Sequence, residues 1–407
     1  MIKREIYLEY LRKLKDQNLI KVIIGIRRSG KSTLLDLFRD ELKLQGVKDK
    51  QIQSYNFEDP ELNYDLDWRK IYEKIIAKIV ADDQNYIFLD EVQTIPKFEK
   101  LVDGLFIKKN IDVYITGSNA FLLSGELATL LTGRYITIHI LPFSFAEYRQ
   151  SFLDEQNEDR LFAEYLNASS FPEAVTLSQR DKNLSMKYIS DVYDTILKRD
   201  IYTRYQIRNK VNFERVLKFI CDNIGSPVSA NAIAAELNRG KKTDEAKITH
   251  NVIVRWLSYL AECYLIYPVS RYNIKGKKLL TTNDKYYIVD LSLRSLLLGR
   301  KSDEDLGHRL ENIVYLELLR RYNVGQIYVG KKDDKEVDFI VQLPNTERLY
   351  IQVAYSVKDS KTLTRELEPL RKIRDNNPKM LLTTDLGSNI YYGIKQINVV
   401  DWLLETK

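Results

Sequence analysis

Near its N-terminus the chain has one stretch that decides the fold of its first third, and it reads Gly25-Ile26-Arg27-Arg28-Ser29-Gly30-Lys31-Ser32-Thr33. The stretch matches the P-loop pattern in full. Its glycines let the backbone curl so that successive N–H groups point at phosphate oxygens. Lys31 would place its charge on the β- and γ-phosphates, and Ser32 would offer a hydroxyl to Mg²⁺. All nine residues are therefore predicted to bind ATP.

The segments on either side of this loop have the character that phosphate binding requires. The apolar run Lys21–Ile24 is typical of a buried strand, and Lys31–Leu44 has its apolar residues at helical spacing. A helix that begins at Lys31 would point its positive end at the phosphates. The alternative is an ordinary Gly/Ser turn before a helix.

Further strands and helices alternate along the first third of the chain. They are expected at Gln53–Phe57 (strand), Trp68–Val80 (helix), Tyr86–Leu89, Val113–Thr116 and Tyr135–Ile140 (strands). This alternation predicts an α/β fold with a mostly parallel sheet and helices on both faces.

Two acids, Asp90 and Glu91, end the apolar strand Tyr86–Leu89. Carboxylates at the end of a buried strand are costly unless a cation faces them. Asp90 is predicted to hold Mg²⁺ through water, and Glu91 to act as general base toward the attacking water. The alternative is a strand end that water solvates. Together with the loop, this pair predicts Mg²⁺-dependent ATP hydrolysis.

Three further polar residues are candidates for a catalytic role. Ser118 and Asn119 leave the strand Val113–Thr116 and would lie beside the γ-phosphate, where they could sense it; a plain turn is the alternative. Arg134 could reach the phosphates of its own or a neighbouring subunit as an arginine finger. The alternative for Arg134 is a surface arginine at the start of a strand.

Composition limits the class of protein. A length of 407 residues predicts two to four domains, and 29% charged residues of mixed sign predict a soluble surface. The net charge of +6 permits a nucleic-acid partner without requiring one. Two cysteines in apolar segments are expected to be reduced core thiols, and three histidines without a Cys/His cluster argue against zinc. With no apolar run of membrane-spanning length, the sequence predicts a cytoplasmic protein that does not enter a membrane.

The middle of the chain has the order of elements of a winged helix. Helical runs at 211–223, 229–237 and 248–264 precede a hairpin at Arg271–Tyr287. From Glu236 to Lys285 there are ten Lys/Arg against five Asp/Glu, which favours duplex DNA as a partner. The residues that would contact DNA are His250, Asn251 and Arg255 in the major groove and Lys275, Lys277 and Lys278 on phosphates. The alternative is a module that binds protein and has a solvated basic tip.

The C-terminal segment has the residue pattern of a PD-(D/E)xK nuclease core that has lost its active site. Glu311 and Asp338 could be two of its metal ligands, but Gln352 stands at the third ligand position and Ala354 at the lysine position. Such a site needs acids for Mg²⁺ and a cation to meet developing charge. A degenerate fold without nuclease activity is therefore expected.

The chain resembles the prokaryotic AAA-type ATPases that have an appended domain of unknown function (AAA_14 with DUF4143), and the likeness covers essentially its whole length. Besides the P-loop, the motifs that carry it are Asn56-Phe57-Glu58-Asp59, Leu89-Asp90-Glu91-Val92-Gln93, Thr116-Gly117-Ser118-Asn119, Leu131-Thr132-Gly133-Arg134, 141–148, Ser170-Phe171-Pro172-Glu173-Ala174 and Leu197-Lys198-Arg199-Asp200-Ile201. One departure is Ser169-Ser170, where the family more often has two glycines. The resemblance implies an ASCE-type fold with a strand inserted between the P-loop strand and the Asp90 strand.

Four segments are expected from these observations: a P-loop ATPase domain at 1–150, a helical connector at 151–208, a winged-helix module at 209–300 and the nuclease-like domain at 301–407. The function predicted is ATP hydrolysis to ADP and phosphate, coupled to nucleic-acid-linked or regulatory conformational change. The alternative is a signalling ATPase whose accessory domains bind protein partners. A homo-oligomer is compatible with either function.

Overall fold

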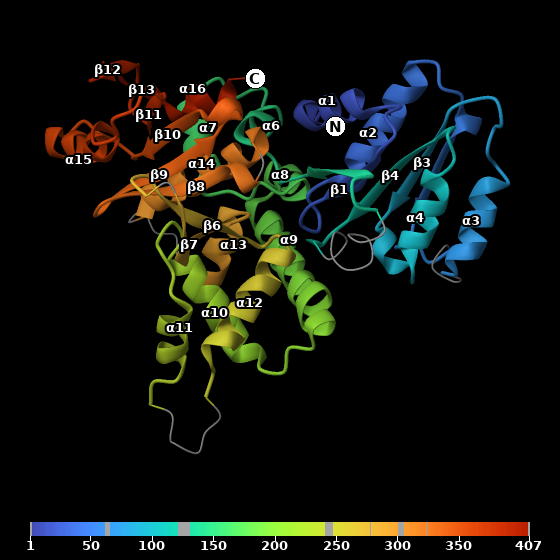
Figure 1. Cartoon of the computed structure of the whole chain (residues 1–407), viewed down its shortest axis with the longest axis horizontal. Coiled ribbons are helices and arrows are strands. Elements are labelled where there is room, and N and C mark those ends of the chain that lie inside the picture. The colour runs from blue at the N-terminus through green and yellow to red at the C-terminus, as the bar shows by residue number, and fades with distance from the viewer. Residues whose placement is uncertain are drawn as a thin grey trace. The chain divides into compact units, whose positions relative to one another are not determined.

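The computed structural model describes residues 2–61, 66–120, 131–240, 247–276, 278–299, 305–322 and 324–405, and Figure 1 shows its elements. The chain forms two compact units. The first consists of Met1–Pro142 together with Glu262–Tyr264, and the second of Phe143–Ala261 and Leu265–Lys407.

The first unit is built on a five-stranded sheet in which every pair of neighbouring strands is parallel. Its strands are β1 (Ile20–Ile24), β2 (Ile52–Asn56), β3 (Asn85–Asp90), β4 (Ile111–Gly117) and β5 (Tyr135–His139), in the spatial order β2-β3-β4-β1-β5. The strand β4 lies between the P-loop strand β1 and the Asp90 strand β3, as the resemblance implied. The predicted parallel α/β sheet is confirmed.

Helices cover both faces of this sheet. They are α1 (Glu5–Leu14), α2 (Lys31–Leu44), α3 (Trp68–Ile76) and α4 (Phe98–Phe106), with short 3₁₀ turns at Asp49–Gln51 and Val92–Thr94. On one face, Leu8 of α1 and Phe38 of α2 join Tyr114 of β4 in an apolar cluster. The helices α3 and α4 contact each other on the opposite face (Figure 1).

The second unit has a mixed sheet of eight strands in the order β12-β13-β11-β10-β9-β8-β6-β7. The strands are β6 (Ile266–Asn273), β7 (Lys278–Ile288), β8 (Ile327–Lys332), β9 (Lys335–Gln342), β10 (Arg348–Val353), β11 (Lys379–Thr383), β12 (Asn389–Tyr391) and β13 (Ile394–Asn398), with 3₁₀ turns at Val324–Gln326 and Pro344–Thr346. Along α14 (Leu306–Arg321) every residue from Arg309 to Arg320 is buried, as expected for a helix enclosed on all sides.

The other helices of this unit lie before, between and after its strands in the chain. They are α6 (Phe145–Arg149), α7 (Glu158–Tyr165), α8 (Pro172–Ser178), α9 (Lys182–Thr195) with a π-helical continuation at Ile196–Thr203, α10 (Lys210–Asp222), α11 (Ala230–Leu237), α12 (His250–Glu262), α13 (Leu291–Leu298), α15 (Ser360–Arg371) and α16 (Val399–Leu404). No helix in the described part of the chain is long and apolar enough to cross a membrane.

The hairpin β6–β7 follows α10, α11 and α12 in the order expected from the sequence, but it does not stand alone. Strand β6 pairs in parallel with β8, with Arg271 opposite Val329 and Asn273 opposite Lys331. The hairpin and the C-terminal strands therefore form one continuous sheet. Lys277 and the side chain of Lys278, two of the predicted phosphate contacts, lie outside the described residues.

Candidate nucleotide-binding site

Three segments with predicted site residues meet at one edge of the parallel sheet. Because β1, β3 and β4 are parallel neighbours, their carboxyl ends lie side by side. The P-loop leaves β1 at Gly25, Glu91 follows β3, and Ser118 follows β4. Strand pairing thus brings together residues that are far apart in the sequence.

The P-loop has a backbone that requires glycine at its first and last turns. A Cβ atom at Gly25 would lie 2.1 Å from the carbonyl oxygen of Ile140, which no side chain can tolerate. Gly30 has φ 95°, in the left-handed region, and caps α2 without a side-chain hydrogen bond. The first N–H groups of α2 therefore have no side-chain cap and can serve an anion.

Lys31 is bound by the loop that it follows. Its Nζ donates to the carbonyl oxygens of Gly25 at 3.1 Å and Ile26 at 3.3 Å, and lies 3.6 Å from Oε1 of Glu91. The side chain is 4% exposed. A buried ammonium with weakly held carbonyl partners can exchange them for phosphate oxygens.

Asp90 is connected to both the P-loop and β4. Its carboxylate accepts hydrogen bonds from the hydroxyls of Ser32 and Thr116. Burial raises the pKa of Asp90 above its usual range, and these two hydrogen bonds work in the opposite direction. The two predicted metal ligands, Ser32 and Asp90, are thus in direct contact.

Glu91 has a left-handed backbone, with φ 53°, and a carboxylate held from several sides. The hydroxyl of Ser118 lies 2.6 Å from Oε1 and 2.5 Å from Oε2, and Gln93 donates its amide to Oε2. Burial tends to raise the pKa of Glu91, but the charge of Lys31 and the hydrogen bonds from Ser118 and Gln93 outweigh it and lower the pKa. The group is therefore a carboxylate at neutral pH.

Thr116 is a site residue that the sequence analysis did not single out. Its Oγ1 accepts the backbone N–H of Glu91 at 2.9 Å and donates to Asp90, so one buried hydroxyl fixes both acids. Arg4 was also missed. It donates to the carbonyl oxygens of Ser29 and Leu141, both at 2.8 Å, and so ties α1 to the P-loop. Thr116 belongs to the motif Thr116-Gly117-Ser118-Asn119, but no role for its hydroxyl followed from the sequence, and Arg4 belongs to none of the motifs.

The remaining P-loop residues divide between buried and accessible positions. Ile26 is buried, and so is Ser29, whose hydroxyl has no hydrogen-bond partner among the described residues. Arg27 forms an ion pair with Glu58 at 2.9 Å. Arg28 is exposed with φ 67°, and Thr33 is half-buried.

Asn119 lies at the same edge of the sheet as Ser118, and its side chain contacts Cys263. Its Nδ2 donates to Sγ of Cys263 at 3.3 Å. Next to this contact, the ring of Tyr264 lies 4.7 Å from that of His139 at the end of β5. The segment Glu262–Tyr264 is therefore part of the first unit, although it lies between α12 and β6 in the chain.

Arg134 lies at the opposite edge of the sheet from the P-loop. It precedes β5, and its carbonyl oxygen accepts the N–H of Ile20, the first residue of β1. Its guanidinium pairs with Asp103 at 2.7 Å. Since five strand residues at about 3.3 Å each separate the two edges, the structure does not bring Arg134 to its own P-loop.

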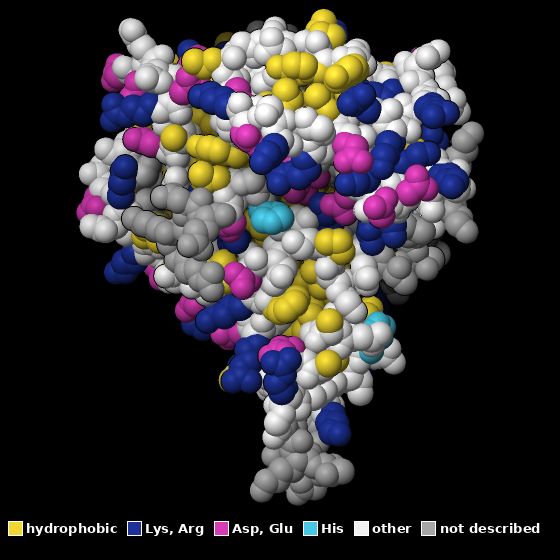
Figure 2. Space-filling model, turned by 90° about the vertical axis from the view of Figure 1, so that its left-hand side faces the viewer, with side chains coloured by type: hydrophobic (Ala, Val, Ile, Leu, Met, Phe, Trp, Pro, Cys, Tyr) yellow, Lys and Arg dark blue, Asp and Glu magenta, His cyan; other side chains and the backbone are white. Residues whose placement is uncertain are grey.

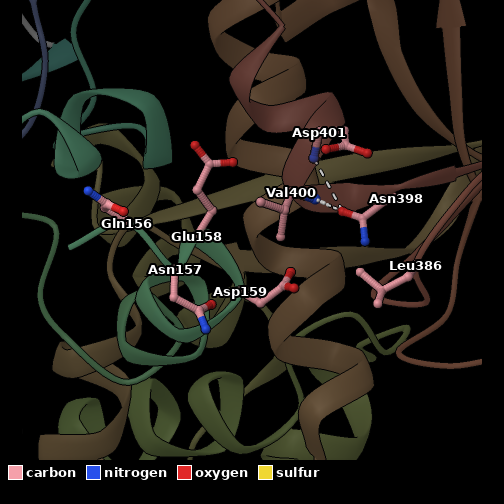
Figure 3. A pocket seen from close by; sticks show the side chains of 8 residues that line it. All are labelled: Gln156, Asn157, Glu158, Asp159, Leu386, Asn398, Val400 and Asp401. Atoms are coloured by element: carbon pink, nitrogen blue, oxygen red, sulfur yellow. Dashed lines mark hydrogen bonds between the residues drawn. The ribbon is translucent and has the colours of Figure 1, made fainter.

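A polar pocket of about 500 Å³ lies in the second unit (Figure 3). Glu158, Asp159 and Asp401 line it, and Asn398 accepts the N–H groups that begin α16. Three carboxylates would repel a nucleotide's phosphates, so this pocket does not compete with the P-loop as the ATP site.

Comparison with known proteins identifies the family of the first unit. The AAA_14 sequence profile, described as an AAA domain, matches residues 17–149. The chain belongs to the AAA_14 family of AAA-type P-loop ATPases. It is therefore a nucleotide-binding ATPase. Residues 159–304 match a different domain of unknown function, DUF8612, and the expected DUF4143 is not confirmed.

Two relatives of this ATPase cover most or all of the chain. An uncharacterized protein of Haemophilus influenzae is 39% identical over 411 residues, covering 100% of this chain and 99% of that protein. An uncharacterized protein of Methanocaldococcus jannaschii is 30% identical, covering 87% and 78%. Among solved structures, a Walker-type ATPase of Pyrococcus abyssi is 15% identical with a TM-score of 0.45, covering 73% of this chain and 96% of that one.

Proposed function

We propose that the first unit hydrolyses ATP to ADP and phosphate with Mg²⁺ as cofactor, and that Glu91 is the general base. The observation that carries this proposal is the arrangement of Glu91, a carboxylate held by Ser118 with Lys31 3.6 Å away. A general base needs to be ionised and fixed in position before the substrate arrives. Both conditions hold here.

The same edge of the sheet supplies the groups that ATP and its metal need. The uncapped start of α2 and Lys31 would bind the β- and γ-phosphates. Ser32 and Asp90, already hydrogen-bonded to each other, would hold Mg²⁺, which neutralises phosphate charge when bound. Ser118 keeps the base oriented and would respond when a γ-phosphate arrives.

A pair of substitutions tests this assignment. Glu91→Gln should keep ATP affinity within about threefold and lower turnover by roughly 10²–10³, because only the base is lost. Lys31→Ala should abolish ATP binding, since the phosphates lose their main side-chain charge. Glu73→Gln, on the exposed side of α3, is the matched carboxylate control. Wild-type turnover in Glu91→Gln would disprove the role of Glu91.

We further propose that ATP turnover drives a conformational change through Asn119 and Cys263. Asn119 follows Ser118 directly, and its partner Cys263 lies between α12 and β6. A shift of Ser118 on loss of the γ-phosphate would therefore reach the polypeptide that joins these two elements.

Hydrogen exchange can test this route without a known partner. Peptides from α12 and β6 should differ in protection between the ATP-bound and ADP-bound protein, and Cys263→Ala should remove the difference while leaving turnover intact. Cys221→Ala, a buried cysteine in α10, is the matched control. A difference that survives Cys263→Ala would disprove the route.

We propose duplex DNA as the partner, with a protein partner as the alternative. His250, Asn251 and Arg255 are all exposed on α12, as groove contacts must be. Favouring the alternative, Lys275 lies 3.6 Å from Asp333, and basic and acidic side chains are interspersed on the face shown in Figure 2.

Salt titration of DNA binding separates the two partners. A DNA-binding module should lose affinity steeply with salt. Arg255→Ala should weaken DNA binding by about 1–3 kcal/mol, because Arg255 is predicted to contact bases in the major groove. Lys218→Ala, an exposed lysine of α10, is the control. Absence of binding at low salt would favour the protein partner.

A further inference from the structure

A buried lysine lies among the acids of the nuclease-like segment. Lys285 is on β7, and its Nζ is 3.0 Å from Oε1 of Glu311 on α14 and 2.5 Å from Oε1 of Glu336 on β9. The hydroxyl of Tyr287, two residues along the same strand, donates to the same oxygen of Glu311 at 2.6 Å. With a side chain that is 2% exposed, Lys285 is enclosed by these partners.

Two acids near Lys285, Glu311 and Asp338, are the ones that a nuclease of this pattern would use to bind metal. Asp338, the second expected ligand, is buried on β9, and its Oδ2 accepts the backbone N–H of Val353 at 2.8 Å. Burial and the negative charge of Glu311 raise the pKa of Asp338, and the charge of Lys285 lowers it. Asp338 also lies two residues along β9 from Glu336, a spacing that puts both side chains on the same side of a strand.

The other two expected positions are engaged elsewhere. The amide of Gln352 accepts the N–H of Asp338 at 3.4 Å and donates to Glu366 at 3.1 Å. Ala354 belongs to an apolar cluster with Val337 and Leu367, where no charge is needed. As they stand, no three His, Cys, Asp or Glu side chains among the described residues are placed to hold a metal ion, so the acids around Lys285 would have to move closer together to bind one.

An ammonium group and a divalent metal ion are stabilised by similar surroundings. Both are compact, strongly hydrated cations that are stable in a buried site only among negative oxygens. A metal ion bound to the same carboxylate oxygens would lie close to the Lys285 ammonium, and two like charges about 4 Å apart repel by about 4 kcal/mol at an effective dielectric constant of about 20. Lys285 already satisfies Glu311 and Glu336, so a metal at this place would have to expel it.

We propose that Lys285 is a built-in cation that takes the place of a divalent metal ion among Glu311, Glu336 and Asp338. The C-terminal segment therefore binds no catalytic metal and cleaves no phosphodiester, and removal of Lys285 creates a divalent-cation site. Lys285 is not a catalytic lysine moved from position 354, because its ammonium is buried against two carboxylates and a phosphate has no access to it.

Mn²⁺ titration of the nucleotide-free full chain, followed by electron paramagnetic resonance, tests the proposal. The parent and its Asp338→Asn variant should bind the same number of Mn²⁺ ions. The parent should also not cleave supercoiled, linear or single-stranded DNA. Lys285→Ala should bind one Mn²⁺ at concentrations at least roughly 10²–10³ times lower than the highest at which the parent shows no such binding, the size expected when a unit charge about 4 Å away is removed. Adding Asp338→Asn to Lys285→Ala should abolish that site.

The proposal would be overturned if the parent had an Asp338-dependent Mn²⁺ site or showed Asp338-dependent cleavage of DNA. It would also be overturned if Lys285→Ala folded and gained no Mn²⁺ site. If Lys285→Ala does not fold, Lys285→Gln retains a hydrogen-bond donor for Glu311 and takes its place. The thermal unfolding transition of the variant that folds should shift upward when Mn²⁺ is added, and an unshifted transition counts against the proposal. The Mn²⁺ titration and the DNA-cleavage assay of the parent test the proposal even if neither variant folds.

Discussion

Thr116→Val gives the sharpest test of how the two acids of the nucleotide site are held. Valine has nearly the same shape and keeps the β-branch that suits a strand, so the change removes only the hydroxyl. That hydroxyl accepts the N–H of Glu91 at 2.9 Å and donates to Asp90. Both partners are buried and would each lose a hydrogen bond.

The cost follows from the number of groups left without a partner. A buried polar group that loses its hydrogen bond costs about 1–3 kcal/mol, so two groups give about 2–6 kcal/mol. Ser32 still donates to Asp90, which favours the lower half of this range. Thr116→Ser keeps the hydroxyl and loses one methyl group, at about 1 kcal/mol.

Hydrogen exchange in peptides of β3 and β4 is the suitable assay, because a global denaturation would combine two structural units. Thr116→Val should lower the opening free energy of these strands by about 2–4 kcal/mol. It should also reduce ATP turnover by tenfold or more, because a small displacement of Glu91 costs about 10²-fold. If Thr116→Val matches Thr116→Ser in both measurements, the hydroxyl does not hold the acids and the reasoning is refuted.

Three further outcomes follow from the geometry. Gly25→Ala should abolish ATP binding in a nucleotide titration, whereas Gly46→Ala, also at positive φ but with open space around it, should not. Arg134→Ala should leave steady-state turnover of isolated chains unchanged within about twofold, since it breaks only an exposed pair with Asp103. Burial raises the pKa of the Cys221 thiol to about 12, so alkylation at pH 8 should label it only after unfolding. Because only the unfolded chain ionises this thiol at its ordinary pKa, the free energy of unfolding is at its full value below that pKa and should fall as the pH rises from it toward 12.

The sequence could predict those parts of the ATP site that are formed by short motifs of adjacent residues. A P-loop needs glycines, a lysine and a hydroxyl at fixed spacing, and a catalytic acid pair follows an apolar strand. The strand order also followed, because the family resemblance implied the insertion of β4. The placement of Ser118 against Glu91 is a consequence of that order.

What the sequence could not predict depends on strand pairing and side-chain direction across long separations. Arg134 was a candidate because an arginine near a P-loop domain can act on phosphates, but the parallel pairing of β5 with β1 places it at the far edge. Thr116 is one of many threonines in apolar strands. Only the register between β3 and β4 shows that its hydroxyl meets both acids.

The position of Lys285 could not be predicted from the sequence either, and it affects how the hairpin β6–β7 is held to the C-terminal strands. Sequence reasoning looks for the nuclease lysine two positions after Gln352 and finds Ala354, whereas the cation comes from the hairpin β6–β7. The hairpin is thus held to the C-terminal strands twice, by the pairing of β6 with β8 and by the ion pairs of Lys285 with Glu311 and Glu336. Breaking such a buried pair costs about 3–5 kcal/mol, so a nucleotide-driven shift that reaches β6 through Cys263 would move the hairpin and the C-terminal sheet together.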